Sequence, residues 1–217
     1  MVRQMVYVLV LCWCVLTISL RPSQADQARE IAERVQAYYE ATKSFVADFE
    51  QEVHWHRGQE VRLSRGKVWF KKPGLMRWEY VWPEPLLVVC DGQKIYVYSE
   101  IDRQVMIFPS GKALSPKVTL GFMSGKGNLL RDFDIRGMER LDSLVALDVA
   151  PKTQNPQVEK LRLLVDPKTG AIKEIWFWDY LGNLTKIRFR NLQRNVDLPP
   201  ELFVFHPPKD VEIIRER

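Results

Sequence analysis

The chain has 217 residues, of which 46% are hydrophobic and 27% charged, with a formal net charge of +5. These proportions exclude an intrinsically disordered chain, and contents of 11 Gly and 3 Cys exclude a collagen or a disulfide-rich miniprotein. The charge excess is too small to indicate a nucleic-acid partner. The length fits one domain that can bury a sizeable core.

Residues 1–25 carry the features of a secretory signal. Arg3 precedes an apolar run from Val6 to Leu16, and Ser23-Gln24-Ala25 places small residues where a signal peptidase cuts. We expect cleavage after Ala25, which leaves a single mature domain over 26–217. An uncleaved anchor is the alternative, although the run is short for a membrane-spanning helix. Cys90 then remains as a lone thiol, and we expect it to be buried and structural.

Residues 26–42 predict one amphipathic helix. Ile31, Ala32, Val35 and Tyr39 recur at helical spacing, and charged side chains occupy the positions between them. Asp26 is the expected N-cap, without the Glu or Gln that completes a capping box. The apolar stripe of this helix needs a surface to cover, and we expect that surface to be a sheet.

After Lys43 the hydrophobic period falls from 3.6 residues to two, which predicts strands. Phe45 and Phe49 share one face of the first strand, and Asp48 and Glu50 share the other. Turn residues between the later strands predict short connections, hence an antiparallel meander rather than βαβ units. The later strands are expected at Val61–Phe70, Leu75–Trp82, Leu86–Cys90, Lys94–Ser99, Gln104–Phe108, Phe133–Glu139, Leu144–Ala150, Lys160–Val165, Ile172–Asp179, Leu184–Leu192 and Phe203–Phe205.

The segment from Pro109 to Arg131 breaks this regularity. It is rich in Gly and Pro, yet it contains Leu120 and Phe122, so short helices or a folded loop fit it better than strands. About eleven antiparallel strands predict an unclosed barrel. The N-terminal helix and this segment are the apolar elements left to plug its mouth.

Large apolar side chains line the face of the strands that we expect to point inward. Met76, Trp78, Tyr80 and Trp82 alternate with the charged Arg77 and Glu79. A packed core and a cavity for an apolar ligand both fit this pattern, because broad rings and Met tolerate incomplete filling. The strand at 61–70 has apolar residues on both faces, so its inward face stays open.

Motifs for catalysis and cofactors are absent from the sequence. It has no nucleophile elbow, Walker loop or dinucleotide fingerprint, so we expect no enzyme activity and no cofactor. His54 and His56 share a strand face without an obvious third ligand, so a solvated face is expected there rather than a metal site. A basic stripe, which is either a solvated sheet face or a docking surface, comprises Lys186, Arg188, Arg190 and Arg194.

Four segments in order along the chain resemble one known family. They are SFVADFEQ at 44–51, GKVWFKKPGLMRW at 66–78, VCDGQKIYVY at 89–98 and FVFHPPKDV at 203–211. Together with the signal, they resemble the LolA family of periplasmic outer-membrane lipoprotein carriers of Gram-negative bacteria. The resemblance implies an α+β fold, with an unclosed antiparallel barrel and a lid of short helices over a hydrophobic cavity.

The resemblance also implies a function and a site. A monomer would shelter lipoprotein acyl chains in the periplasm, taking them from an inner-membrane ABC transporter complex and passing them to an outer-membrane receptor. Lys72 falls where many members have an Arg that bonds the lid; Lys lacks the planar fork of Arg, so we expect a less firmly latched lid. An envelope sensor or assembly protein of the same fold is an alternative, and a lipid hydrolase is another. The residues expected to face the ligand are Phe45, Phe49, Trp69, Met76, Trp78, Tyr80, Leu120, Phe122, Ile187 and Phe189.

Overall fold

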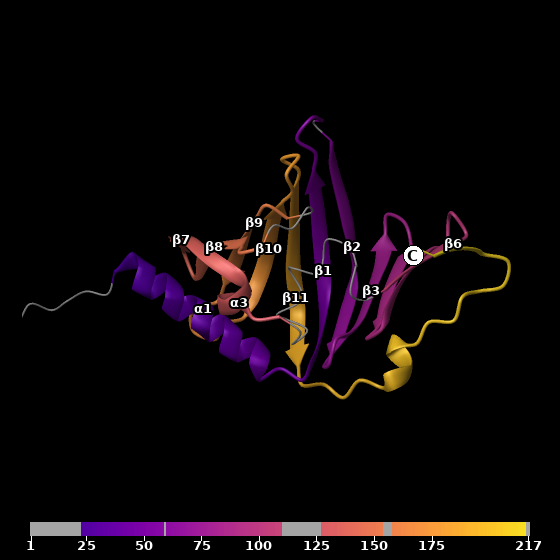
Figure 1. Ribbon diagram of the computed structural model, residues 1–217, viewed down its shortest axis with the longest axis horizontal. Helices are drawn as coiled ribbons and strands as arrows, with labels where there is room; N and C mark the ends of the chain where they lie inside the picture. The colour runs from indigo at the N-terminus through magenta and orange to yellow at the C-terminus, as the bar shows by residue number, and fades with distance from the viewer. Residues whose placement is uncertain (1–22, 59, 110–126, 154–157, 216–217) are drawn as a thin grey trace, which may run out of the picture.

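A curved, unclosed sheet of twelve strands dominates the part of the chain that the structure describes (Figure 1). The computed structural model describes residues 23–58, 60–109, 127–153 and 158–215. The strands are β1 (Ser44–His54), β2 (Val61–Lys71), β3 (Leu75–Trp82), β4 (Leu86–Asp91), β5 (Lys94–Ser99), β6 (Gln104–Pro109), β7 (Phe133–Leu141), β8 (Leu144–Pro151), β9 (Lys160–Val165), β10 (Ile172–Trp178), β11 (Leu184–Arg194) and β12 (Glu212–Arg215). Their spatial order is β12-β6-β5-β4-β3-β2-β1-β11-β10-β9-β8-β7.

The predicted antiparallel meander is confirmed within β1–β6 and within β7–β11, and the antiparallel pairing of β1 with β11 joins the two runs. The strand β12 pairs with β6 in parallel, and this pairing was not predicted. The strand expected at Phe203–Phe205 was wrong, because the chain forms the 3-10 helix η1 (Pro200–Phe203) there. Pro200 is the first residue of η1, where its fixed φ suits a helical turn and its missing N–H needs no partner.

The helix α1 (Gln24–Glu40) begins two residues before the predicted start. Ser23 is its N-cap: the Ser23 hydroxyl accepts from the Asp26 amide, and the Asp26 carboxylate accepts from the Ser23 amide. The prediction that Asp26 caps the helix without a box was therefore wrong. Asp26 occupies the third helical position and completes a capping box, since Asp can accept this bond as Glu does.

The buried stripe of α1 packs along β7, β8 and the short helix α3 (Leu129–Asp132), at one end of the sheet (Figure 1). We call the sheet face that packs against α1 the inner face, and the opposite face the outer face. Cross-strand register continues the inner face through β1, where Phe45, Ala47 and Phe49 point inward. The alternation predicted for this strand is confirmed, with Asp48 and Glu50 on the outer face.

The C-terminal part of the chain returns across the other end of the sheet. The helix η1 contacts β3 and β4, and Phe203 is buried. The Phe205 ring lies 5.4 Å from the ring of Tyr96 and 5.8 Å from that of Tyr98. Both tyrosines alternate with the inward-facing Ile95 and Val97, so this segment covers the outer face of β5.

Candidate ligand-binding site

Cross-strand register builds continuous apolar rows on the inner face. Phe45, Phe70 and Met76 are neighbours across β1, β2 and β3, and the row beside them contains Val68 and Trp78. Both rows then cross β4 and β5 to reach β6. The first continues through Cys90 and Ile95 to Phe108, and the second through Val88 and Val97 to Met106.

An aromatic cluster lies at the centre of these rows. The Phe49 ring centroid is 4.7 Å from that of Trp78 and 4.9 Å from that of Tyr80. Phe189 on β11 closes the cluster with its ring 6.4 Å from Trp78. Aromatic pairs at these separations contribute stabilisation in addition to that from burying their surface. This extra interaction holds the rings in a defined arrangement.

Gly66 on β2 makes room for this cluster. A Cβ at this position would lie 1.9 Å from the Glu79 carbonyl oxygen and 2.9 Å from a ring carbon of Phe49. Any larger side chain at this position would collide with the β3 backbone. The glycine therefore lets the Phe49 ring pack directly against the backbone of β2. Gly66 opens the second segment that resembles the LolA family, and close packing is a physical reason for a glycine there.

Few polar atoms interrupt the central part of the inner face. The Tyr80 hydroxyl donates to Oε1 of Gln51 at 3.0 Å, and burial raises the pKa of Tyr80 to about 12. The buried Trp78 Nε1–H has no hydrogen-bond partner among the described residues. This region is therefore uncharged at neutral pH, and it suits hydrocarbon rather than an ionic ligand.

Most of the predicted site residues are together on this face. Phe45, Phe49, Trp78, Ile187 and Phe189 are buried members of one apolar cluster. Met76 and Tyr80 are half-buried and pack against the same cluster. Leu120 and Phe122 lie outside the described residues, as does most of the predicted lid segment 109–131.

Trp69 was placed on the wrong face by the prediction. Its cross-strand neighbours are Val46 and Arg77, and the Lys67 ammonium lies 5.9 Å from its ring centroid, so Trp69 belongs to the outer face. Strand β2 is apolar on both sides here, so its own period could not identify the inward side.

Trp82 also fails to point inward. The register of β3 slips between Tyr80 and Trp82, leaving Val81 without a cross-strand neighbour. A bulge of this kind turns the following side chain over, and Trp82 lies under Arg65 with 5.3 Å between the guanidinium carbon and the ring centroid. The inward face of β3 therefore ends at Tyr80.

Lys72 contacts the N-terminal helix. Its ammonium donates to the carbonyl oxygens of Tyr39 at 2.6 Å and Glu40 at 3.0 Å, at the C-terminal end of α1. Burial lowers the pKa of Lys72, while the nearby Glu40 carboxylate opposes this shift. The residue that was expected to bond a lid thus bonds one of the two apolar elements expected to cover the sheet.

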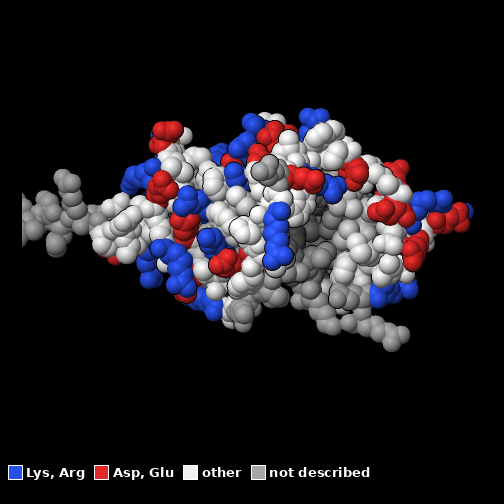
Figure 2. All heavy atoms as spheres, turned by 90° about the horizontal axis from the view of Figure 1, so that it is seen from above, with Lys and Arg blue, Asp and Glu red and all other residues white. Residues whose placement is uncertain are grey.

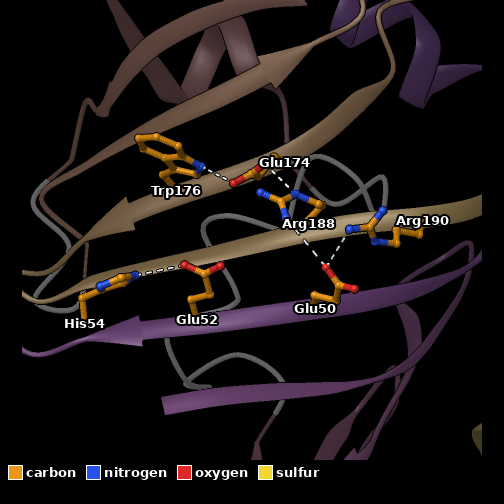
Figure 3. Close-up of polar contacts among 7 residues, drawn as sticks. All are labelled: Glu50, Glu52, His54, Glu174, Trp176, Arg188 and Arg190. Atoms are coloured by element: carbon orange, nitrogen blue, oxygen red, sulfur yellow. Dashed lines mark hydrogen bonds and ion pairs between the residues drawn. The ribbon is translucent and has the colours of Figure 1, made fainter. Parts of the chain in front are cut away.

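The outer face holds a ladder of ion pairs (Figure 3). Arg190 lies 3.0 Å from Glu50, and Arg188 lies 3.0 Å from Glu174. Glu174 also accepts from the Trp176 indole N–H at 2.6 Å. These contacts favour the solvated-face reading of the basic stripe over the docking reading for its central residues.

Other outer-face groups have similarly local partners. His54 Nε2 lies 3.1 Å from the Glu52 carboxylate, and the Lys186 ammonium lies 4.4 Å from the Trp176 ring centroid. Seen from above, acidic and basic side chains of the described residues are interspersed rather than separated by sign (Figure 2). Within the described ranges, no three His, Cys, Asp or Glu side chains gather as metal ligands would. The helices described there are also too short or too polar to cross a membrane.

The sequence profile of the family described as "Outer membrane lipoprotein carrier protein LolA" matches residues 40–206. The chain belongs to the LolA family. A relative from Dechloromonas aromatica, named outer-membrane lipoprotein carrier protein, is 28% identical over 205 residues, covering 94% of this chain and 94% of its own. One of the same name from Legionella pneumophila (strain Lens) is 30% identical over 186 residues, covering 85% of this chain and 90% of its own.

Solved structures share the fold at lower sequence identity. An uncharacterized conserved protein from Thermus thermophilus superposes with a TM-score of 0.53 at 19% identity, covering 87% of this chain and 99% of that one. A DUF1329 family protein from Desulfovibrio piger gives 0.51 at 15% identity, covering 84% and 98%. The open sheet of this LolA-family chain therefore occurs in proteins with little sequence in common.

Two features of the candidate site and its surroundings were missed by sequence reasoning. The first is the extension of the apolar rows to Val88, Met106 and Phe108. The alternation within each strand does not show which residues of neighbouring strands align, so these rows become visible only from the register. The second is Arg194, which was assigned to the basic stripe but donates to α1. Asn191, in a left-handed conformation with φ of 51°, is the local signal for that change of face.

Proposed function

We propose that this LolA-family chain is a non-enzymatic periplasmic carrier that holds the acyl chains of lipoproteins against its inner face. The uncharged apolar rows that run from β1 to β6 carry this proposal. A continuous surface of rings, Val and Met side chains matches flexible hydrocarbon, which needs burial but few directional bonds. The names of the relatives, outer-membrane lipoprotein carrier protein, support the same cargo.

Energetics explain why such a carrier needs partners. Each buried methylene contributes about 0.8 kcal/mol, so a chain of about 15 methylenes would gain about 12 kcal/mol when fully buried. Release into water at that cost is too slow for transport, so an acceptor must offer equivalent burial. An ABC-type complex in the inner membrane would load the carrier, and a receptor at the outer membrane would receive the cargo.

Export by residues 1–25 belongs to the same proposal. Cleavage after Ala25 removes Ser23, the cap of α1, and makes Asp26 the first residue of the mature chain. The helix would then begin without its capping box, which is worth about 1 kcal/mol. N-terminal sequencing of the periplasmic protein tests the cleavage position directly.

Isolation of the protein with its cargo tests the proposed function. The full chain is expressed with its signal, purified from the periplasm without detergent, and its bound molecules are identified by mass spectrometry. We expect triacylated lipoproteins or their acyl chains, which then move to outer-membrane vesicles that contain the receptor. Bound lipid without such handover would support the envelope-sensor alternative, and a protein free of any amphiphile would refute the acyl-chain site.

A further inference from the structure

We infer that Arg194 is a positioning residue that fixes the last turn of α1 beside the apolar inner face. The inference rests on the proposed function only where ligand uptake is concerned. Arg194 is the last residue of β11, and its neighbour across the ladder is Phe45 of the inner face. It therefore lies on the same side of the sheet as α1.

A bulge in β11 places Arg194 there. Asp48 pairs with Arg190 and Val46 with Gln193, so two residues of β11 oppose Ala47. Asn191, at φ of 51°, supplies the left-handed residue of this bulge, and its side-chain Nδ2 donates to the Asp48 carboxylate at 2.8 Å. Without the bulge, a strict period of two would put Arg194 on the outer face with Arg188 and Arg190.

The Arg194 guanidinium, turned to the inner face by the bulge, makes three contacts near the C-terminal end of α1. Arg194 Nη1 donates to the Tyr38 carbonyl oxygen at 3.1 Å and to the Thr42 hydroxyl oxygen at 3.3 Å. Its central carbon lies 3.9 Å from the Tyr38 ring centroid, a close cation–π distance. The half-buried Tyr38 ring packs against the same apolar cluster that contains Phe45 and Trp78.

Arg194 and Lys72 together supply the positive charge that the last turn of α1 lacks. The last turn of α1 contains no basic residue, although a helix C-terminus carries partial negative charge and unpaired carbonyls. Lys72 donates to the carbonyls of Tyr39 and Glu40. Arg194 donates to the carbonyl of Tyr38, which also accepts from the Thr42 hydroxyl at 2.7 Å. Two cations, one from the turn after β2 and one from β11, thus bind the helix end. The planar guanidinium of Arg194 also stacks on the Tyr38 ring, a contact for which the Lys72 ammonium has no equivalent plane.

Hydrogen exchange measured by mass spectrometry on the purified full chain tests this role. Arg194→Met keeps most of the volume and removes the charge, and we expect the amides at the C-terminal end of α1 to exchange about tenfold faster, equivalent to about 1.4 kcal/mol. Arg194→Lys should restore part of the protection, because the charge stays while the planar contact is lost. Adding Lys72→Met to Arg194→Met should accelerate exchange further. Arg190→Met is the matched control, since Arg190 lies on the same strand but faces Glu50.

The outcomes separate this role from a general structural one. Faster exchange confined to α1, with unchanged amides in β1 and β11, supports the inference. Equal exchange in Arg194→Met and Arg190→Met, or a uniform rise throughout the sheet, overturns it. A fluorescent fatty acid should also be taken up severalfold faster by Arg194→Met, and unchanged uptake would refute the link to the site. If the unmodified protein takes up no probe, the proposed function fails, while the exchange result still decides the role of Arg194.

Discussion

Introducing a charge at Trp78 is the most direct test of the inner face. The Trp78 side chain is 5% exposed and contacts the rings of Phe49 and Phe189 in the central aromatic cluster. Trp78→Glu removes these ring contacts and places a carboxylate among hydrocarbon, where nothing described compensates its charge. An unpaired buried charge costs several kcal/mol, and loss of the ring adds a cost of the order of 3 kcal/mol. These costs lower the free energy of unfolding. In protein that still folds, hydrocarbon that covers this carboxylate would have to desolvate it, so acyl-chain binding should be abolished.

The same substitution has a pH signature. Desolvation raises the pKa of a buried carboxyl, so the new side chain becomes neutral as the pH falls through that raised value. Binding of a fluorescent acyl probe and the free energy of unfolding in urea should therefore both partly recover between about pH 7.5 and 5. Trp78→Phe, which keeps an apolar ring, should bind the probe within a few-fold of the unmodified protein at every pH.

Trp69→Glu is the matched control for this experiment. Trp69 is on the neighbouring strand but faces outward, beside Lys67 and Arg77. The same change of chemistry should leave probe binding and lipoprotein extraction unchanged there. If Trp78→Glu folds and still extracts lipoproteins normally, or if both substitutions reduce binding equally, the inner face is not the acyl-chain site.

Two further substitutions test the geometry of the central cluster. Gly66→Ala should lower the free energy of unfolding by about 1–3 kcal/mol, because its Cβ would overlap the Glu79 carbonyl; an unchanged urea midpoint would contradict the close approach. Burial raises the pKa of Tyr80 to about 12, so the unfolded chain loses this proton first and stability should fall as the pH rises from about 10 to 12. Tyr80→Phe should make that fall shallower in urea unfolding at a series of pH values, and an identical slope would show that Tyr80 is not buried.

Local periodicity predicted the strands and most of the site. On β3, Met76, Trp78 and Tyr80 alternate with Arg77 and Glu79, and a strand with one charged side leaves no doubt about its inward face. Strand β2 lacks this contrast near Trp69, so its inward face depends on pairing with β1 and β3. Strand pairing joins residues that are far apart in the sequence. The residues of one strand alone therefore do not show which partner positions they will face.

The other errors have two physical sources. Bulges reverse the face of the residues that follow them, which moved Trp82 outward and Arg194 inward. Asn191 is the only direct sign of the second bulge, and Asn also occurs widely in ordinary turns. The C-terminal apolar run was mistaken for a strand because Phe203 packs as η1 on the sheet instead of pairing within it.

Outside the central aromatic cluster, stability should depend mainly on β9 and β10, and binding mainly on β4 and β6. Leu163 and Ile175, on β9 and β10, are completely buried beside α1's core cluster, whereas Val88 and Met106 on β4 and β6 are half-buried. Leu163→Ala should therefore lower the free energy of unfolding by about 2–5 kcal/mol, because the cavity it leaves cannot be filled by solvent. Val88→Ala removes fewer buried contacts, so it should change stability less and acyl-probe affinity more. Urea unfolding and probe titration on the two variants measure both quantities, and the opposite order would show that β4 and β6 do not contribute to the ligand site.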